Sequence, residues 1–407
     1  MKHSGFEKVA FFYATFPRPT ETFVRRELKA LHERGFSPTV FSIWRGAQMW
    51  EEIRINRFKL FNLWSLPFWI LYWSWKHPSA FCEVLNALWN RPCPSFQNWN
   101  ETFLGLGYAL VQAKTIENQN FKLFHGVWAT MPATAAFALS KLLNIPFSMG
   151  AHAYDVFRKG GDWILREKIM SASMIRTSSK SSAKRLVQIA KNEEKIRVIR
   201  RGLSKWPVRD SFEPVKFGEI KLISVGRLVE KKGYFKLLHI LSLLKKRNRV
   251  TFKMKIVGDG PLHNQLNEEI KRLSLSSHVE MLGARSEKKV NDLFLNSDIM
   301  IFTGVIASNG DRDGIPNVIP EAMAAGCLVL GSSKAGASEA FIDGVSGFSL
   351  NPYSPFDWVK VLEDFAHKPK FYSAIRKKAQ VETQERFNVS RTAGKLISTF
   401  QEINSEQ

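Results

Sequence analysis

Short apolar runs alternate with longer helical patterns along almost the whole chain of 407 residues, and this alternation limits the possible folds more than any other feature. The runs KVAFFYATF and PTVFSI, for example, enclose a helical pattern that contains Phe23, Leu28 and Leu31. Strands and helices that alternate in this way form a parallel sheet with helices on its faces. The sequence therefore predicts an α/β protein.

The alternation occurs twice, which predicts two doubly wound, Rossmann-like domains. The second series starts at KLISVGR, after the polar, proline-containing stretch SKWPVRDSFEP, which we interpret as the linker. Residues 45–120 interrupt the pattern. We expect an N-terminal domain over residues 1–203, a C-terminal domain over 204–384 and a final helix over 385–407, whose packing partner the sequence does not indicate.

The charge balance predicts an anionic partner. The chain has 59 Lys and Arg residues against 37 Asp and Glu residues, a net charge of +22. Nucleotide phosphates, nucleic acid and an acidic membrane all qualify. The three cysteines, Cys82, Cys93 and Cys327, are odd in number and lack metal-ligand spacing, which favours a reducing compartment. The apolar start from Val9 to Phe16 is too short for a secretion signal and predicts a buried strand instead. We therefore expect a cytoplasmic protein.

In doubly wound folds, ligands bind beyond the carboxyl ends of the strands, so the loops that follow strands are candidate sites. The strand KLISVG ends in Gly226 and Arg227, and Lys232 follows at a helix start. Glycine lets the backbone approach a ligand, arginine offers a planar set of donors and lysine a compact charge, which together suit a diphosphate. A solvated basic loop is the alternative.

Two later loops also carry candidates. The turn Gly258–Gly260 follows the strand FKMKIV, and a simple strand-to-helix turn also explains it. Asp313 precedes a helix that we expect from Gly314 to Ala325, with Glu321 inside it. Free amides at a helix start can hold sugar hydroxyls or phosphate. A capping acid on an ordinary amphipathic helix is the alternative.

Two histidines end predicted strands of the first half. His125 lies in FKLFHG, and His152 follows IPFSMGA with Asp155 three residues later. A lone histidine at the end of a strand is more often structural, so both explanations stay open. The first loop carries three polar candidates for an acceptor side, with helix capping as the alternative: Arg18, Thr20 and Glu21.

Several motifs occur in the order and at the spacing of one known family. DGIPN before EAMAAG, with SVGRLVEKKG, IVGDGPL and VEMLG upstream, resembles the nucleotide-sugar site of family-4 glycosyltransferases of the GT-B fold. FPRPTETFVRREL, HGVWATMPATAAFAL and IPFSMGAHAYDVF resemble segments of the same family. The resemblance covers nearly the full length apart from residues 45–120. It is nearest to transferases that build bacterial exopolysaccharide and lipid-linked surface glycans.

The resemblance implies a retaining hexosyltransferase whose two Rossmann-like domains face each other across a cleft. The donor would be a nucleoside-diphosphate sugar and the acceptor a glycan or lipid-linked glycan. No metal or other cofactor is expected, because Arg227 and Lys232 would neutralise the diphosphate. Asp313 would hold the sugar, and Glu321 would accept from the ribose hydroxyls. The implied donor-binding residues are Gly226, Arg227, Lys232, Gly258, Asp259, Gly260, Asp313, Gly314, Ile315, Pro316, Asn317 and Glu321.

In the other domain, the resemblance implies that His152 faces the sugar and that Asp155 orients its loop. The chain departs from the family at two positions. Asp313 stands where the family more often has Glu, and Arg201 where it often has His. The shorter Asp313 puts its reach to the sugar, and the identity of the donor, in question.

The segment from Phe61 to Trp75 is aromatic and apolar, and it falls short of the ~20 residues that span a bilayer. Aromatic side chains with basic flanks suit a helix that lies in the interface of an anionic membrane. We predict that Trp69 and Trp73 attach the protein peripherally to the inner face of the cell membrane, with no transmembrane helix. A core helix is the alternative. The basic flanks are Arg54, Arg57, Lys59 and Lys76.

Two other functions stay open. A sugar-nucleotide epimerase or hydrolase could share the fold, although the Arg-Lys pair and the two acids favour transfer. A nucleic-acid-binding protein would use the net charge, but none of its usual motifs is present and the aromatics cluster away from Arg227. We therefore expect no nucleic-acid partner.

Overall fold

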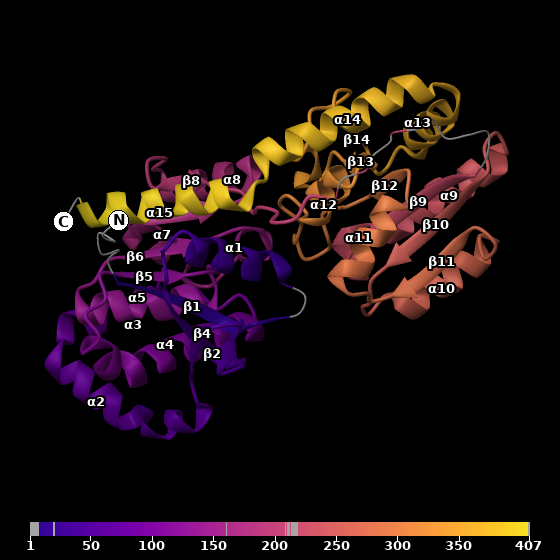
Figure 1. Cartoon of the computed structure of the whole chain (residues 1–407). Coiled ribbons are helices and arrows are strands. Elements are labelled where there is room, and N and C mark those ends of the chain that lie inside the picture. The colour runs from indigo at the N-terminus through magenta and orange to yellow at the C-terminus, as the bar shows by residue number, and fades with distance from the viewer. Residues whose placement is uncertain are drawn as a thin grey trace. The chain divides into compact units, whose positions relative to one another are not determined.

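The computed structural model describes residues 8–18, 21–159, 161–207, 209, 212 and 219–405. The chain forms two compact units, Met1–Arg200 together with Val389–Gln407, and Arg201–Asn388. Each unit contains one largely parallel sheet with helices packed on it (Figure 1). The prediction of two doubly wound α/β domains is confirmed.

The first unit contains an eight-stranded sheet in the order β3-β4-β2-β1-β5-β6-β7-β8. Neighbouring strands are parallel except β3 and β4. β1 lies between β2 and β5, so the strand order reverses between β1 and β5. The strands are β1 Val9–Phe16, β2 Thr39–Gly46, β3 Met49–Trp50, β4 Ile53–Arg57, β5 Leu123–Gly126, β6 Phe147–Gly150, β7 Met174–Thr177 and β8 Ile196–Val198.

Side chains of β1 alternate between two hydrophobic cores. Phe11 and Tyr13 pack with residues of α1 and α15, whereas Ala10 and Phe12 pack with residues of α4 and α5. Successive side chains of a strand point to opposite faces, so each face of this sheet has its own core. The helices of the unit are α1 Thr22–Glu33, η1 Leu60–Ser65, α2 Leu66–Lys76, α3 Pro78–Trp89, α4 Phe96–Glu117, α5 Met131–Leu143, α6 Tyr154–Phe157, α7 Leu165–Ser171, α8 Lys180–Ala190 and α15 Val389–Ser405.

The last helix, α15, packs against α1 in the first unit (Figure 1). Phe400 is 1% exposed, stacks on Phe36 at 5.8 Å between ring centroids and lies edge-on to Phe11 at the same distance. The chain therefore leaves the first unit after Arg200 and returns to it at Val389.

The interrupting segment forms β3 and β4 and then η1, α2, α3 and α4. Trp73 of α2 is completely buried, and its Nε1 donates to the carbonyl of Leu110 at 2.8 Å. The expectation that Trp73 faces lipid is therefore wrong, and Trp69 is half-buried against the same core. Of the helices formed by the described residues, none combines the length and the apolar character needed to cross a membrane.

The second unit contains a six-stranded, wholly parallel sheet in the order β11-β10-β9-β12-β13-β14. Counted from β9, this is the order 3-2-1-4-5-6 of Rossmann folds, which reverses between β9 and β12. The strands are β9 Ile220–Val225, β10 Phe252–Val257, β11 Val279–Gly283, β12 Ile299–Phe302, β13 Leu328–Ser332 and β14 Phe348–Leu350. The helices are η2 Glu230–Lys232, α9 Tyr234–Arg247, α10 His263–Arg272, α11 Glu287–Leu295, α12 Val318–Ala324, η3 Gly336–Glu339, α13 Pro355–His367 and α14 Pro369–Arg386.

Candidate functional site

Two loops meet at the point where the strand order of the second sheet reverses. β9 and β12 are neighbours, so the loops that follow them leave the sheet side by side. The Thr303 hydroxyl donates to the carbonyl of Gly233 at 2.9 Å, and the amide of Val305 donates to the carbonyl of Lys231 at 2.9 Å. In open α/β sheets, ligands bind at such a reversal point. The topology thus joins residues 226–233 and 303–317 in one candidate site.

Glycines allow the close approaches in this region. Gly233 has a φ of 70°, and a Cβ there would lie 2.0 Å from the carbonyl oxygen of Thr303. Gly258 has a φ of 146°, and a Cβ there would lie 1.9 Å from the carbonyl oxygen of Gly226. Only glycine meets both the conformation and the contact. The two glycines therefore let neighbouring loops pack backbone to backbone.

The turn after β10 supports the loop that carries Arg227. The carbonyl of Asp259 accepts from the amide of Leu228 at 2.9 Å, while its Oδ1 accepts from the amide of Gly260 at 2.7 Å. The side chain of Tyr234 donates to the carbonyl of Gly226 at 2.9 Å. The backbone around Arg227 is thus fixed on both sides, and the Arg227 side chain is exposed.

A charged cluster lies where the loops meet. Nζ of Lys232 is 2.7 Å from Oδ2 of Asp313. Nζ of Lys231 is 3.4 Å from Oδ1 of Asp313 and 2.9 Å from Oδ2 of Asp311. The structure thus brings together Lys232 and Asp313, two predicted site residues that lie far apart in the sequence.

Charge and burial act in opposite directions on this cluster. Burial works to raise the pKa of Asp313, but the charges of Lys232 and Lys231 outweigh it, so the pKa is lowered. Burial works to lower the pKa of Lys231, but Asp313 and Asp311 outweigh it, so the pKa is raised. Both shifts favour the ionised forms, and at neutral pH Asp313 and Lys231 are charged.

Lys231 and Asp311 were not among the predicted site residues. Lys231 is only 9% exposed. Lysine is almost never buried without a partner, and here the carboxylates of Asp311 and Asp313 are the partners. Two further hydrogen bonds connect the same loops. The carboxylate of Glu230 accepts from the amide and from the hydroxyl of Ser308, each at 2.8 Å. The only signal in the sequence is the doubled Lys-Lys and the Asp-x-Asp pattern, and neither indicates that the two would meet.

The helix expected from Gly314 begins only at Val318, so residues 314–317 form a bend and a turn that lead into α12. Ile315 precedes Pro316, and a residue before proline disfavours the helical conformation. The predicted position of Glu321 inside a helix is correct, because it lies in the first turn of α12 and is half-buried. Gly314 is buried against Gly336, where a Cβ would come within 2.6 Å of its carbonyl.

In the first unit, the loop after β6 is organised by Asp155, which is fully buried. Its Oδ1 accepts from the amides of His152 at 3.1 Å and Ala153 at 2.7 Å, and its Oδ2 accepts from the amide of Ala129 at 3.3 Å. Burial raises the pKa of Asp155, and these amides oppose that rise. His152 is 5% exposed, and its ring lies edge-on to Trp128 at 5.2 Å.

A buried ion pair supports the same loop. Lys168 and Asp162 are both fully buried, with Nζ 2.6 Å from Oδ2. Lys168 also donates to the carbonyl of Ala129 and, at 3.0 Å, to the hydroxyl of Thr134. Burial lowers the pKa of Lys168, although Asp162 opposes this. The loops after β5 and β6 are therefore held from within the core.

The acceptor-side candidates lie after β1. Arg18 and Glu21 form an exposed ion pair at 3.4 Å, and Thr20 lies outside the described residues. Glu21 precedes α1 without capping it through its side chain. His125 is buried, shares a hydrogen bond of 2.8 Å with Ser148, and packs on aromatic rings, which fits the structural alternative.

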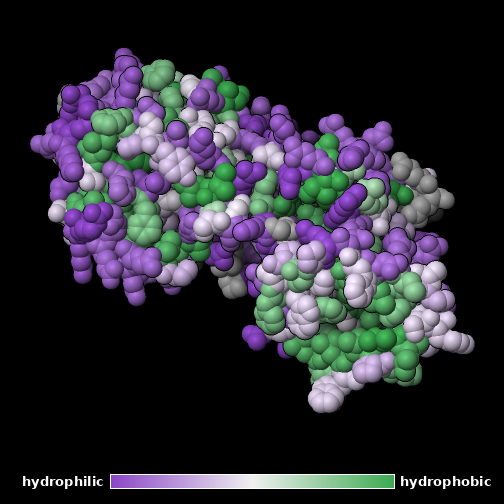
Figure 2. Space-filling model, turned by 180° about the vertical axis from the view of Figure 1, so that it is seen from behind, coloured by the Kyte–Doolittle hydropathy of each residue, from purple (hydrophilic) through white to green (hydrophobic). Residues whose placement is uncertain are grey.

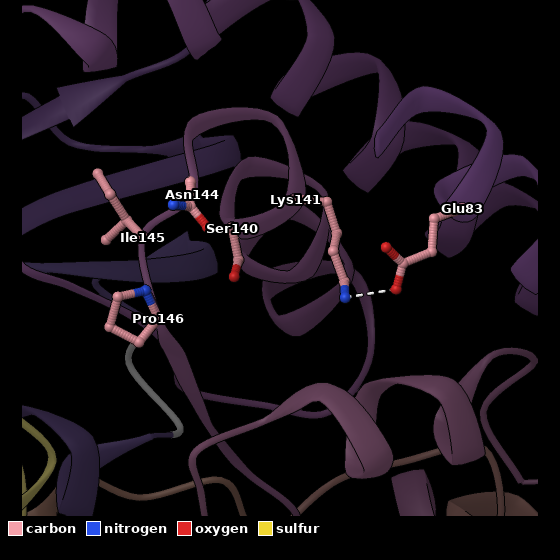
Figure 3. Close-up of a pocket in the computed structure, with 6 residues that line it drawn as sticks. All are labelled: Glu83, Ser140, Lys141, Asn144, Ile145 and Pro146. Carbon is pink, nitrogen blue, oxygen red and sulfur yellow. Dashed lines mark ion pairs between the residues drawn. The ribbon is translucent and has the colours of Figure 1, made fainter. Parts of the chain in front are cut away.

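A hollow of about 560 Å³ opens elsewhere in the first unit. Figure 3 shows Lys141 and Glu83 pointing toward each other across it, with Ser140, Asn144, Ile145 and Pro146 beside them. It lies at the end of α5 and the start of β6, hence at the edge of the sheet opposite the loop of His152. No predicted site residue lines it. Within the described ranges, no group of three His, Cys, Asp or Glu side chains is arranged to hold a metal ion.

Comparison with known proteins connects this geometry to a family. Residues 209–382 match the family model described as "Glycosyl transferases group 1". The chain is 34% identical over 159 residues to the putative colanic acid biosynthesis glycosyltransferase WcaL of Escherichia coli (strain K12). It is 29% identical over 164 residues to the amylovoran biosynthesis glycosyltransferase AmsK of Erwinia amylovora. These matches cover 39% and 40% of this chain and 38% and 40% of the relatives, so they span about two fifths of the relatives' length.

Solved structures resemble the whole chain. Anabaena Alr3699/HepE in complex with UDP-glucose has a TM-score of 0.71 at 17% identity, over 97% of this chain and 100% of that one. Sucrose-phosphate synthase from Thermosynechococcus elongatus has a TM-score of 0.74 at 14% identity, over 98% and 100%. At such identities the likeness concerns the fold, which is GT-B.

Proposed function

We propose that this chain transfers a hexose from a nucleoside-diphosphate sugar to a glycan or lipid-linked acceptor with retention of anomeric configuration. The match of residues 209–382 to the family model of group 1 glycosyl transferases supports this. The observation that carries the proposal is the pairing of Lys232 with Asp313, at 2.7 Å, where the order of the second sheet reverses. At this position the ammonium group of Lys232 would bind the diphosphate of the donor, and the carboxylate of Asp313 would bind its sugar.

The diphosphate would bind to Arg227 and Lys232. Arg227 is exposed on a loop whose backbone is fixed by the Asp259 turn, so its donors are available to a ligand. Positive charge placed where the leaving diphosphate gains negative charge lowers the barrier to transfer. The proposed transfer therefore uses these two side chains for charge neutralisation and needs no metal ion.

Binding of the diphosphate would change the partner of Lys232. Without a ligand, Lys232 and Lys231 share the carboxylate of Asp313. A diphosphate carries more negative charge than one carboxylate and would attract Lys232 toward itself. Lys231, which also contacts Asp311, would stay with Asp313 and keep that carboxylate ionised beside the sugar. Lys231 thus acts as a positioning residue.

Other contacts to the donor follow from the same loops. The amides and side chains from Gly314 to Asn317 would hold the sugar, Glu321 would accept from the ribose hydroxyls, and the Gly258–Gly260 turn would line the nucleotide. UDP-glucose is the first donor to test, because it is the ligand of the similar Anabaena protein. From the first unit, His152 would face the sugar, with Asp155 setting its loop and the Arg18 loop contributing to the acceptor side.

The relatives named for colanic acid and amylovoran biosynthesis support a growing surface polysaccharide as the acceptor. We place the reaction in the cytoplasm. Cys82, Cys93 and Cys327 are all free thiols, which suits a reducing compartment. We propose no nucleic-acid partner, and a gel-shift measurement at physiological salt tests this directly.

The function is tested with purified protein, a panel of UDP-, GDP- and ADP-sugars, and lipid-linked glycan acceptors, in the presence of EDTA. We expect acceptor-dependent release of one nucleoside diphosphate and a product whose anomeric configuration, read from NMR coupling constants, equals that of the donor. Release that ignores the acceptor would instead indicate a hydrolase. Activity that EDTA abolishes would contradict the metal-independent mechanism.

A further inference from the structure

Five large apolar side chains form a continuous stripe along η1 and α2. They are exposed by 77%, 81%, 61%, 71% and 81%, in the order Phe61, Trp64, Phe68, Leu71 and Trp75. They recur at alternating spacings of three and four, which places them on one side of a helical segment. We call them the aromatic stripe.

The opposite side of α2 is also apolar. Trp73 is completely buried, and Leu66 and Trp69 pack on the core of the first unit. A helix that is apolar on all sides normally lies in a protein interior or in lipid. α2 already fills its share of the core, so the aromatic stripe needs a second apolar environment.

The charges around the segment decide which environment fits. Residues 60–75 contain no charged side chain. Tryptophan is enriched both at protein interfaces and where a membrane meets water, so the aromatic content fits either environment. Exposed basic residues immediately before the segment add an attraction to negative charge. An uncharged aromatic stripe preceded by basic residues favours an anionic lipid bilayer.

Exposed basic residues precede the stripe in the chain. They are Arg54, Arg57 and Lys59, immediately before η1. Lys76 ends α2, but its Nζ is 3.0 Å from Oε1 of Glu117, so its charge is already paired within the protein. Positive charge beside an apolar face complements anionic headgroups, and together they supply the two forces that hold a peripheral protein on a membrane.

The neighbouring helices extend the apolar region. Both α3 and α4 pack against α2, and Trp89 and Phe96 on them are 85% and 80% exposed. In Figure 2 the first unit, at lower right, shows a largely green and pale face with little purple. An apolar surface of this kind on a monomer marks an interaction site.

We propose that the aromatic stripe inserts into the interface of an anionic bilayer, with the helix α2 lying parallel to the membrane surface and the Arg54–Lys59 segment on the headgroups. This docking would hold the chain beside a lipid-linked acceptor. Lipid binding is measured without donor or acceptor, so its outcome is independent of the proposed transfer.

The test is co-sedimentation of the full chain with vesicles of phosphatidylglycerol and phosphatidylcholine, compared with vesicles of phosphatidylcholine alone. W64S/W75S removes two indoles that are exposed and therefore not needed for folding. The matched control is F356S/F371S, which removes two aromatics of α13 and α14 that are 63% and 51% exposed in the second unit. Thermal unfolding checks that each variant is folded, and F61S/L71S replaces W64S/W75S if that variant unfolds.

We expect the wild type and the control to bind anionic vesicles and the stripe variant to bind at least about tenfold more weakly, because interfacial burial of each indole is lost. Added salt and R57E/K59E should also weaken binding. The proposal is overturned if the wild type does not bind anionic vesicles, or if the stripe variant and the control bind equally. It is also overturned if, without lipid, W64S/W75S converts a wild-type dimer into a monomer, since a second copy would then cover the stripe.

Discussion

The carboxylate of Asp313 is divided between two consecutive lysines, with Oδ1 3.4 Å from Nζ of Lys231 and Oδ2 2.7 Å from Nζ of Lys232. Lys231 also has a second acid, Asp311, at 2.9 Å, and among the described residues Lys232 pairs with Asp313 alone. The two ammonium groups are therefore not equivalent, because Lys231 is neutralised by a pair of acids and Lys232 by one shared acid. This asymmetry is the reason why the proposed diphosphate would recruit Lys232 rather than Lys231.

Replacement of Arg227 or Lys232 by alanine should reduce turnover by about 100-fold or more, the size of effect seen when a group that stabilises transition-state charge is lost. The unfolding temperature of the Arg227 variant should stay near that of the wild type, because Arg227 is exposed. The Lys232 variant loses an ion pair with Asp313, which Lys231 still contacts, so its folding is checked separately. Steady-state kinetics with the preferred donor measure this. Lys246→Ala, an exposed lysine of α9, serves as the control. Wild-type turnover in either site variant would exclude the proposed diphosphate contact.

Glu321→Gln should weaken binding of the free nucleoside diphosphate, because an amide accepts fewer hydrogen bonds from two ribose hydroxyls than a carboxylate does. Asp313→Asn should leave that affinity nearly unchanged and lower the rate of sugar transfer instead. Calorimetric titration with UDP, together with turnover numbers, separates the two effects. Equal losses of UDP affinity in both variants would contradict the division between ribose and sugar contacts.

Lys231→Met should weaken UDP binding by about tenfold, equivalent to about 1.4 kcal/mol. Without Lys231, release of Lys232 to the diphosphate leaves the Asp313 carboxylate without a counter-charge. The double variant K231M/D313N should recover much of the lost affinity, since the carboxylate that needed compensation is gone. A double variant that binds UDP no better than K231M would mean that Lys231 only maintains the loop structure.

The stability contributed by Asp313 should depend on pH. Its pKa is lower in the folded protein than the ordinary 3.8, so its contribution is complete above that value and is lost as the pH falls through the folded pKa. The free energy of unfolding of the wild type should exceed that of D313N by a constant amount from pH 8 to about pH 5 and approach it in stronger acid. Urea unfolding of both proteins over this range provides the measurement. A difference that grows on acidification would have the wrong sign.

The two faces of α2 should respond differently to substitution. Trp73→Ala removes a fully buried indole and its bond to Leu110, and should lower the free energy of unfolding by about 3–5 kcal/mol. Trp64→Ser changes a side chain that is 81% exposed. This substitution should change the free energy of unfolding by less than about 0.5 kcal/mol. Comparable losses in both variants, measured by urea unfolding, would show that Trp64 also contributes to folding.

The sequence predicted the strands around the site well, because buried parallel strands are short apolar runs that end at glycine. Gly226 and Gly258 could be recognised in this way, and Lys232 from its position after Gly226. The pairing of β9 with β12 could not be predicted, because the order of strands in a sheet depends on long-range packing. For the same reason Lys231 and Asp311 were missed, since their role arises only when two distant loops touch.

The aromatic segment shows a second limit. Its composition does not indicate which face of the helix is buried and which is exposed, because apolar residues occupy every side. Trp73 and Trp75 are two positions apart, yet one is fully buried and the other is 81% exposed. The packing of α2 on α3 and α4 separates them. The absence of helix at Ile315, by contrast, agrees with a local rule that the sequence did contain, the restriction that Pro316 imposes on the residue before it.

The return of the chain to the first unit at Val389 makes the second unit, in topological terms, an insertion between Arg200 and Val389. Leu396 and Phe400 of α15 are 0% and 1% exposed, so the first unit lacks part of its core until α15 has been synthesised. The second unit, although it follows in sequence, is continuous and can complete its core earlier on the ribosome. Translation would therefore finish the later unit first, and a premature stop after α14 would spare the second unit while leaving the first one exposed to proteolysis.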